Sequence, residues 1–272
     1  MTTRSITSRG DAQPRQGWPP WLRSIWHNAY FYSRTWRSSV ATSFLQPILY
    51  LAAMGIGVGT LVDHQSGGVD GVSYLKFVAP GLLAATVLQL GVNECTYPVM
   101  GALKWVKTYW AKVATPLSVG DVAAGHLGWV AIRCAMVSTI YLLVMVLFGV
   151  PSSALAILVI PAAVLSGMAT AAPTAAFAAR QDDDVPFALL FRLGVLPMFL
   201  FSGIFYPVDR LPGFLQPIAE LSPLTHGAAL CRAVTLDRGL GWGTVFDVVY
   251  LSLWCAVGSW LTLREFRRKL IV

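Results

Sequence analysis

The chain has 272 residues, of which 56% are hydrophobic and only 12% are charged, and its formal net charge is +7. Soluble domains carry about 25% charged residues, so this composition excludes an ordinary soluble domain and indicates an integral membrane protein. The basic residues flank apolar segments and form no stripe with interleaved aromatic residues, which argues against nucleic acid as a partner.

The N-terminal region divides into two segments. Residues 1–17 are polar and rich in arginine, and no apolar region with a cleavage site follows them. We therefore expect a disordered cytoplasmic tail and no cleaved signal peptide. Residues 18–37 place aromatic side chains at roughly helical spacing with arginines between them. This pattern favours an amphipathic helix that lies in the membrane interface; an aromatic belt that anchors the first span is the alternative.

Six further segments are long and apolar enough to cross a bilayer, which takes roughly 20 mostly apolar residues. The predicted spans are 38–62, 76–98, 119–148, 154–178, 187–206 and 243–263. Residues 134–179 hold no Asp, Glu, Lys or Arg and are too long for one helix, so the "FGVPSS" stretch at 148–153 predicts a turn between two spans. The sequence thus predicts an all-α integral membrane protein with a six-helix transmembrane domain over 38–263.

The distribution of basic residues predicts the orientation. Of the 20 Lys and Arg residues, 14 lie in the N-terminal segments, in the loops at 99–118 and 179–186, and in the basic C-terminal tail at 264–272, whereas four lie on the opposite side. The positive-inside rule then puts both termini and that tail in the cytoplasm, and an even number of spans agrees with this.

The cytoplasmic loop between spans two and three is the most informative stretch for function. It mixes basic, aromatic and small residues over 103–129, beginning "LKWVKTYWAKVATPLS". Aromatic side chains in a short cytosolic helix are typical of insertion into a groove of a partner protein. Anchoring of the rings at the lipid headgroups is the alternative.

Two stretches resemble a known family. "KTYWAKVATPLSVGDVAAGHLGWVAIR" is similar to the loop between spans two and three of ABC-2 type transporter permeases, where a Tyr precedes a short hydrophobic patch and an acidic residue opens the third helix. Here these are Tyr109, residues 114–118 and Asp121. "FLFSGIFYPVDRLPGFLQPIAELSPLTHGAALCRA" resembles the segment before span six in the branch of nodulation-type lipo-oligosaccharide and daunorubicin-type drug exporters. With the predicted topology, the resemblance covers nearly the whole chain.

The resemblance implies a permease subunit of an ABC exporter in a bacterial cytoplasmic (inner) membrane. Two permease subunits, of the same or different chains, would form the path, and two copies of an ABC ATPase would bind them from the cytoplasm. ATP and Mg²⁺ would bind to the ATPase, with no cofactor in this chain. The substrate would be an amphiphile, such as a lipid-linked glycan, a lipo-oligosaccharide or a hydrophobic drug, moved out of the cytoplasm or the inner leaflet.

The loop between spans two and three would then be the coupling helix that sits in the ATPase. The residues expected to couple to the ATPase are Lys107, Tyr109, Trp110, Lys112, Thr115 and Pro116. Pro116 is expected to end this helix. Relatives commonly carry an Arg before the Tyr, whereas this chain has Lys104 and Lys107, and a Lys point charge does not replace an Arg fork.

The segment between spans five and six is apolar yet broken by prolines. We expect one or two short helices that re-enter the outer leaflet, with prolines fixing the turns, because non-helical backbone at that depth needs protein or water around it. The hypothesis is an exit gate formed by Phe205, Pro207, Leu211, Pro212, Phe214 and Leu215.

Two charged residues, Glu94 and Arg133, fall inside predicted spans. Such charges are costly and usually face the protein interior or a watery path. A Glu94–Arg133 pair is geometrically plausible, either as a fixed salt bridge or as a cytoplasmic-side point of access for an amphiphile with an anionic head.

The sequence argues against ATP binding, catalysis and a metal site in this chain. The phosphate-binding pattern GxxxxGK[ST] is absent, so we expect that this chain does not bind ATP and is not an enzyme. Asp182, Asp183 and Asp184 suit a solvated turn better than a metal site, which would want further ligands. An ion-coupled secondary transporter is the alternative function, although the two halves of the chain show no similarity of the kind such proteins carry.

Overall fold

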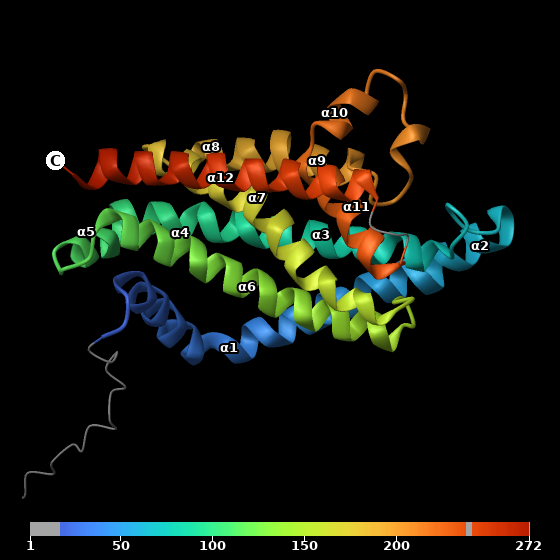
Figure 1. Ribbon diagram of the computed structural model, residues 1–272, viewed down its shortest axis with the longest axis horizontal. Coiled ribbons are helices and arrows are strands. Elements are labelled where there is room, and N and C mark those ends of the chain that lie inside the picture. The colour runs from blue at the N-terminus through green and yellow to red at the C-terminus, as the bar shows by residue number, and fades with distance from the viewer. Residues whose placement is uncertain (1–16, 238–240, 272) are drawn as a thin grey trace, which may run out of the picture.

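The computed structural model describes residues 17–237 and 241–271, with the backbone alone for residues 35–44, 56 and 66. The tail predicted over 1–17 therefore lies outside the described residues, except for Gly17. Within the described ranges the chain forms helices and no strand (Figure 1), which confirms the all-α prediction. In chain order the elements are α1 (Pro20–Ala52), η1 (Ala53–Gly59), α2 (Thr60–Ser66), α3 (Tyr74–Cys95), α4 (Tyr97–Met100), η2 (Gly101–Trp105), α5 (Thr108–Val113), α6 (Val119–Leu147), η3 (Ala154–Leu158), α7 (Val159–Arg180), α8 (Val185–Leu189), η4 (Leu190–Val195), α9 (Leu196–Phe201), η5 (Val208–Arg210), α10 (Gln216–Glu220), α11 (Pro223–Thr235) and α12 (Trp242–Leu270).

The first helix runs unbroken through the predicted boundary between interfacial helix and first span. Figure 1 shows α1 changing direction between its dark-blue start and its lighter-blue end. The start of α1 packs on α6, where Ser24 lies against Gly125 and Ile25 lies against Gly128. Several aromatic side chains of this part are exposed, namely Trp21, Trp26, Tyr30 and Phe31. Their exposure is compatible with headgroup contact, and the interfacial position stays a prediction.

Five helical stretches are long and apolar enough to cross a membrane, and they overlap five of the six predicted spans. They are Leu45–Gln65, Tyr74–Trp105, Val119–Leu147, Ala154–Arg180 and Trp242–Leu270. The remaining predicted span, 187–206, corresponds to the shorter apolar helix Val185–Phe201. That helix ends earlier than predicted because Gly203 adopts a φ of +70°, in the left-handed region that favours glycine. The chain is a multi-pass membrane protein, while a sixth crossing stays a prediction.

Small residues let the central helices approach one another closely. A Cβ added to Gly91 of α3 would lie 2.9 Å from the carbonyl oxygen of Gly167 in α7. A Cβ added to Gly258 of α12 would lie 2.4 Å from the ring of Pro173, also in α7. Close packing through small residues is how membrane helices gain van der Waals contact, since lipid offers no hydrophobic drive between helices. The core is therefore built around α7, which crosses the bundle diagonally in Figure 1.

The segments predicted to be cytoplasmic gather at one end of the bundle. In Figure 1, α5, α8 and the C-terminus lie on the left, whereas α2 and α10 lie on the right. Asp182, after α7, bonds to Lys104 at 2.8 Å and lies 3.7 Å from Lys269. These two ammonium groups hold the pKa of Asp182 below its usual value. The basic loop, the α7–α8 turn and the C-terminal helix thus form one connected surface, as the predicted orientation requires.

Candidate functional site

The residues predicted to contact an ATPase lie on α5 and on the turns beside it. Lys107 adopts a φ of +57°, which turns the chain sharply between η2 and α5. The helix ends at Val113, before Pro116, and the hydroxyl of Thr115 donates to the carbonyl oxygen of Lys112 at 2.6 Å. Both Thr115 and Pro116 are exposed. The sequence anticipated a short helix here, but the helix ends three residues before the proline that was expected to end it.

The start of the next helix follows the motif described above. Ser118 and Asp121 form a capping box at the first turn of α6. The Asp121 carboxylate accepts from the Ser118 backbone N–H at 3.0 Å, and the Ser118 hydroxyl oxygen accepts from the Asp121 N–H at 3.1 Å. Two backbone N–H groups that no helical carbonyl can reach are thus satisfied. Asp121 opens α6 as the family pattern implied.

Tyr109 faces the bundle and not the outside. Its side chain is only 4% exposed, and its ring centroid lies 5.2 Å from that of Phe266 and 6.1 Å from that of His126. A side chain this buried offers no surface to a partner in this conformation. Tyr109 instead attaches α5 to α12 and α6, so a positioning role fits it better than the predicted direct contact.

Lys112 also faces inward. Its ammonium group donates to the Ser24 hydroxyl at 3.1 Å and lies 5.9 Å from the centre of the Tyr109 ring. Burial lowers the pKa of Lys112 to about 8, because desolvation disfavours the charged form. Lys112 thus connects α5 to α1.

The exposed part of this region is apolar with one basic residue. Trp105, Val106, Lys107 and Trp110 are exposed, and we call these four residues the coupling face. The Trp110 indole N–H donates to the carbonyl oxygen of Leu103 at 3.0 Å, which fixes the orientation of the ring. Val106 has no special signal in the sequence and was not anticipated.

Glu94 and Arg133 form the anticipated pair. The Arg133 Nε lies 3.3 Å from a Glu94 carboxylate oxygen, in an ion pair that lacks good hydrogen-bond geometry. The guanidinium carbon of Arg133 lies 4.3 Å from the centre of the Tyr32 ring, and that ring packs edge-on against Trp129. The cluster joins α1, α3 and α6. The stacking on Tyr32 could not be read from the sequence, since the two residues are far apart in the chain.

We expect a charge swap to separate the two roles open to this pair. Arg133→Ala leaves a mostly buried carboxylate alone, which typically costs about 3–5 kcal/mol. Glu94→Arg combined with Arg133→Glu should regain much of that stability, though not the stacking on Tyr32. If the pair only holds the bundle together, export should recover with stability, measured as the thermal midpoint in detergent. A stable double variant that does not export would show that the arrangement of charges meets the substrate.

The predicted exit-gate residues lie on a long excursion of the chain, residues 202–215, at the end of the bundle opposite the coupling face. Phe205 and Pro207 are half-buried, and the Phe205 ring packs on Phe199 with centroids 5.3 Å apart. Leu211 is buried, and its carbonyl oxygen accepts from the Gln216 amide at 2.9 Å. Leu215 is half-buried, whereas Pro212 and Phe214 are exposed. The six residues therefore do not form one cluster, since some face the bundle and others face away from it.

Two short helices follow this excursion, and they differ in depth. α10 is five residues long and projects from the bundle at the upper right of Figure 1. α11 is largely buried and packs against α3, α7 and α12, with Gly227 next to Ser166 and Ala84. Short helices were anticipated here. Their re-entry into a leaflet stays a prediction.

No metal centre is evident in the part of the chain that the structure describes. Residues 17–237 and 241–271 contain no group of three or more His, Cys, Asp and Glu side chains that could hold an ion. The expectation that ATP and Mg²⁺ bind to a partner remains a prediction.

Comparison with known proteins identifies the family to which the chain belongs. The sequence pattern of the family described as "ABC-2 type transporter" matches residues 21–236. Nodulation protein J of Rhizobium leguminosarum bv. viciae is 28% identical over 255 residues, covering 92% of this chain and 95% of that protein. The inner membrane transport permease YadH of Escherichia coli (strain K12) is 26% identical over 211 residues, covering 75% and 78%. Since the family pattern spans most of the sequence, the chain belongs to the ABC-2 type transporter family.

Proposed function

We propose that this chain is the transmembrane permease subunit of an ATP-driven exporter in a bacterial inner membrane, with six spans and both termini in the cytoplasm. The observation that carries the proposal is the coupling face, an exposed apolar and basic surface on a short helix. That helix is fixed to the bundle from several sides and lies at the end where the basic segments gather. A mere connection between two spans has no need for such a surface.

The contacts of α5 suggest how motion would pass from an ATPase to the membrane. Two ATPase copies, each with ATP and Mg²⁺, would press on the coupling faces of two permease subunits, of the same or different chains. The helix could not yield alone, because Tyr109 attaches it to α6 and α12 and Lys112 attaches it to α1. Displacement of α5 would therefore move these helices as a body and switch access between the two sides.

An amphiphile is the substrate class that fits. A cavity of about 240 Å³ lies between α3, α7, α12 and the Val185–Phe201 helix, and its lining is almost wholly apolar, including Phe177, Met198 and Trp254. Such a lining suits an acyl chain or a hydrophobic drug. The similarity to nodulation protein J favours a lipid-linked sugar such as a lipo-oligosaccharide.

Reconstitution with the partner ATPase tests the function. The chain should copurify with an ATPase that carries a phosphate-binding loop, and candidate amphiphiles should stimulate ATP hydrolysis in proteoliposomes. Export that runs without ATP and follows an ion gradient would instead support the alternative, a secondary transporter. Lipo-oligosaccharides, other lipid-linked glycans and hydrophobic drugs should be compared side by side, since their relative stimulation identifies the substrate.

A further inference from the structure

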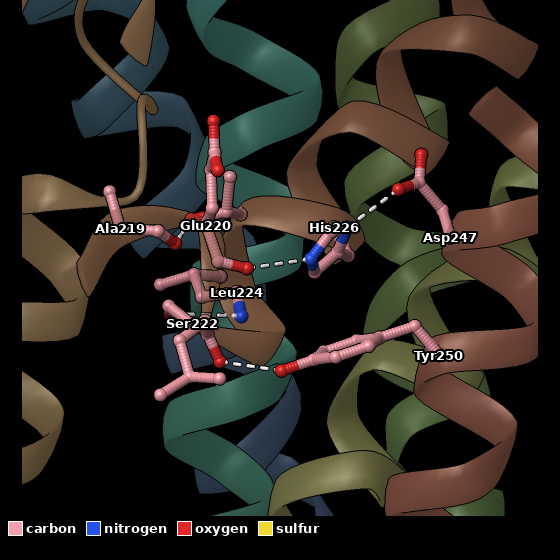
Figure 2. Close-up of polar contacts among 9 residues, drawn as sticks. Ala219, Glu220, Ser222, Leu224, His226, Asp247 and Tyr250 are labelled. Atoms are coloured by element: carbon pink, nitrogen blue, oxygen red, sulfur yellow. Dashed lines mark hydrogen bonds and ion pairs between the residues drawn. The ribbon is translucent and has the colours of Figure 1, made fainter. Parts of the chain in front are cut away.

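His226, near the start of α11, lies between two hydrogen-bond acceptors. Its Nδ1 is 2.7 Å from a carboxylate oxygen of Asp247 in α12, and its Nε2 is 2.8 Å from the backbone carbonyl oxygen of Glu220 in α10 (Figure 2). The side chains of His226 and Asp247 are both mostly buried. One imidazole ring thus joins α10, α11 and α12.

These two contacts bear on how the ring is protonated. A backbone carbonyl oxygen can only accept, so Nε2 must hold a proton. An ionised carboxylate can only accept as well, so Nδ1 must hold a second one. A neutral imidazole has a single N–H, and it would set a lone pair against one of the two oxygens. The arrangement therefore fits the imidazolium form of His226.

Tyr250 completes the contact one turn further along α12. Its hydroxyl donates to the carbonyl oxygen of Leu221 at 2.6 Å, and its ring centroid lies 4.2 Å from that of His226 (Figure 2). The ring of Phe246, also on α12, packs edge-on against the imidazole, with centroids 5.6 Å apart. Three α12 side chains thus hold the turn between α10 and α11 against the bundle.

The charges around His226 are both acidic. Asp247 faces it from α12, whereas the carboxylate of Glu220 on α10 points away from the ring and acts on it most weakly (Figure 2). Helices α3 and α7 bring Ala84 and Ser166 to this part of α11. The bond to Asp247 is the largest of the effects that raise the pKa of His226 above its ordinary value of 6.5. Because the folded protein binds this proton more tightly, the stabilisation is complete below that ordinary value and is lost as pH rises through the raised pKa.

We propose that His226, Asp247 and Tyr250 form a proton-binding clamp, in which protonated His226 holds the α10–α11 turn on α12 and loss of the proton loosens it. The regulatory consequence rests on the proposed function, under which this end of the bundle faces outward. Outside pH would then set how readily the segment before α11 opens. Export would change with outside pH even at constant ATP.

Hydrogen–deuterium exchange of the full-length chain in lipid nanodiscs tests the clamp without any transport assay. After correction for intrinsic rates, amides of residues 216–226 should exchange about tenfold faster at about pH 9.5 than at about pH 5.5, as expected for loss of one charge-assisted bond. His226→Gln should remove this pH step, and so should Asp247→Asn. Tyr250→Phe is the matched control, since it loosens the turn at both pH values but keeps the step.

Two results would overturn the clamp: a wild-type segment whose exchange shows no pH step, or a His226→Gln variant that keeps it. The regulatory part has its own test, export by the full transporter at varied outside pH. A profile that is the same in wild type and His226→Gln overturns that part. If no ATP-driven export occurs at all, the proposed function fails, while the exchange data still decide whether the clamp exists.

Discussion

Alanine at both Trp105 and Trp110 should abolish most transport-coupled ATP hydrolysis without unfolding the chain. The two rings are the largest exposed side chains of the coupling face, with Trp105 59% exposed. Tryptophan anchors at protein interfaces commonly contribute about 2 kcal/mol each, so the pair should weaken ATPase binding roughly 1,000-fold. The measurements are the dissociation constant for the ATPase in nanodiscs and the hydrolysis rate that substrate stimulates.

The control for this prediction is a more exposed tryptophan at the other end of the bundle. Trp242 begins α12 and is also exposed, so Trp242→Ala removes the same kind of surface far from the coupling face. It should leave ATPase affinity and coupled hydrolysis unchanged. Normal hydrolysis by the Trp105/Trp110 double variant would mean that the ATPase docks elsewhere.

Tyr109 should be left intact in that experiment. Removing a buried aromatic ring typically costs about 3–5 kcal/mol, so Tyr109→Ala would loosen α5 itself. Lost hydrolysis could then come from lost contact or from a misplaced helix.

The spans and the common side of the basic segments could be predicted because long apolar runs and charge asymmetry are strong, local signals. The direction of Tyr109 could not, since a helix of six residues is too short for its periodicity to show which face is buried. The end of the helix at Phe201 depends on the backbone angle of Gly203, and glycine is permitted both inside and outside helices.

The polar contacts at the end of the bundle that carries α10 could not be predicted, for a different reason. His226 lies in the stretch that resembles the family, but Asp247 is 21 residues further along the chain, and no motif of fixed spacing links the two. Arg232 is visible in the sequence only as a basic residue on the less basic side. The Glu94–Arg133 pair could be anticipated because charged residues inside membrane spans are rare and usually form pairs.

Arg232 joins three segments through their backbone. Its Nε donates to the carbonyl oxygen of Phe77 at 2.9 Å, and its Nη2 donates to those of Gly203 and Ile204 at 2.5 and 3.1 Å. The guanidinium carbon lies 4.0 Å from the centre of the Phe77 ring. These carbonyls belong to the start of α3 and to the bend where the helix before the excursion stops. Arg232 thus supplies hydrogen bonds that the broken helix cannot provide.

Arg232→Ala should therefore destabilise the chain strongly. Each buried acceptor left without a donor costs about 1–3 kcal/mol, so losing three should cost about 3–5 kcal/mol after partial relaxation. For a chain of this size that corresponds to a thermal midpoint lower by about 10 °C in detergent.

Arg232→Lys should fall in between, because an ammonium group keeps the charge but cannot span three carbonyls with a planar fork. Arg210→Ala is the matched control, since Arg210 is an exposed arginine on the same excursion and should leave the midpoint unchanged. Equal midpoints for Arg232→Ala and Arg210→Ala would contradict the assignment. An Arg232→Lys variant as stable as wild type would show that charge alone, without the fork, holds the bend to α3.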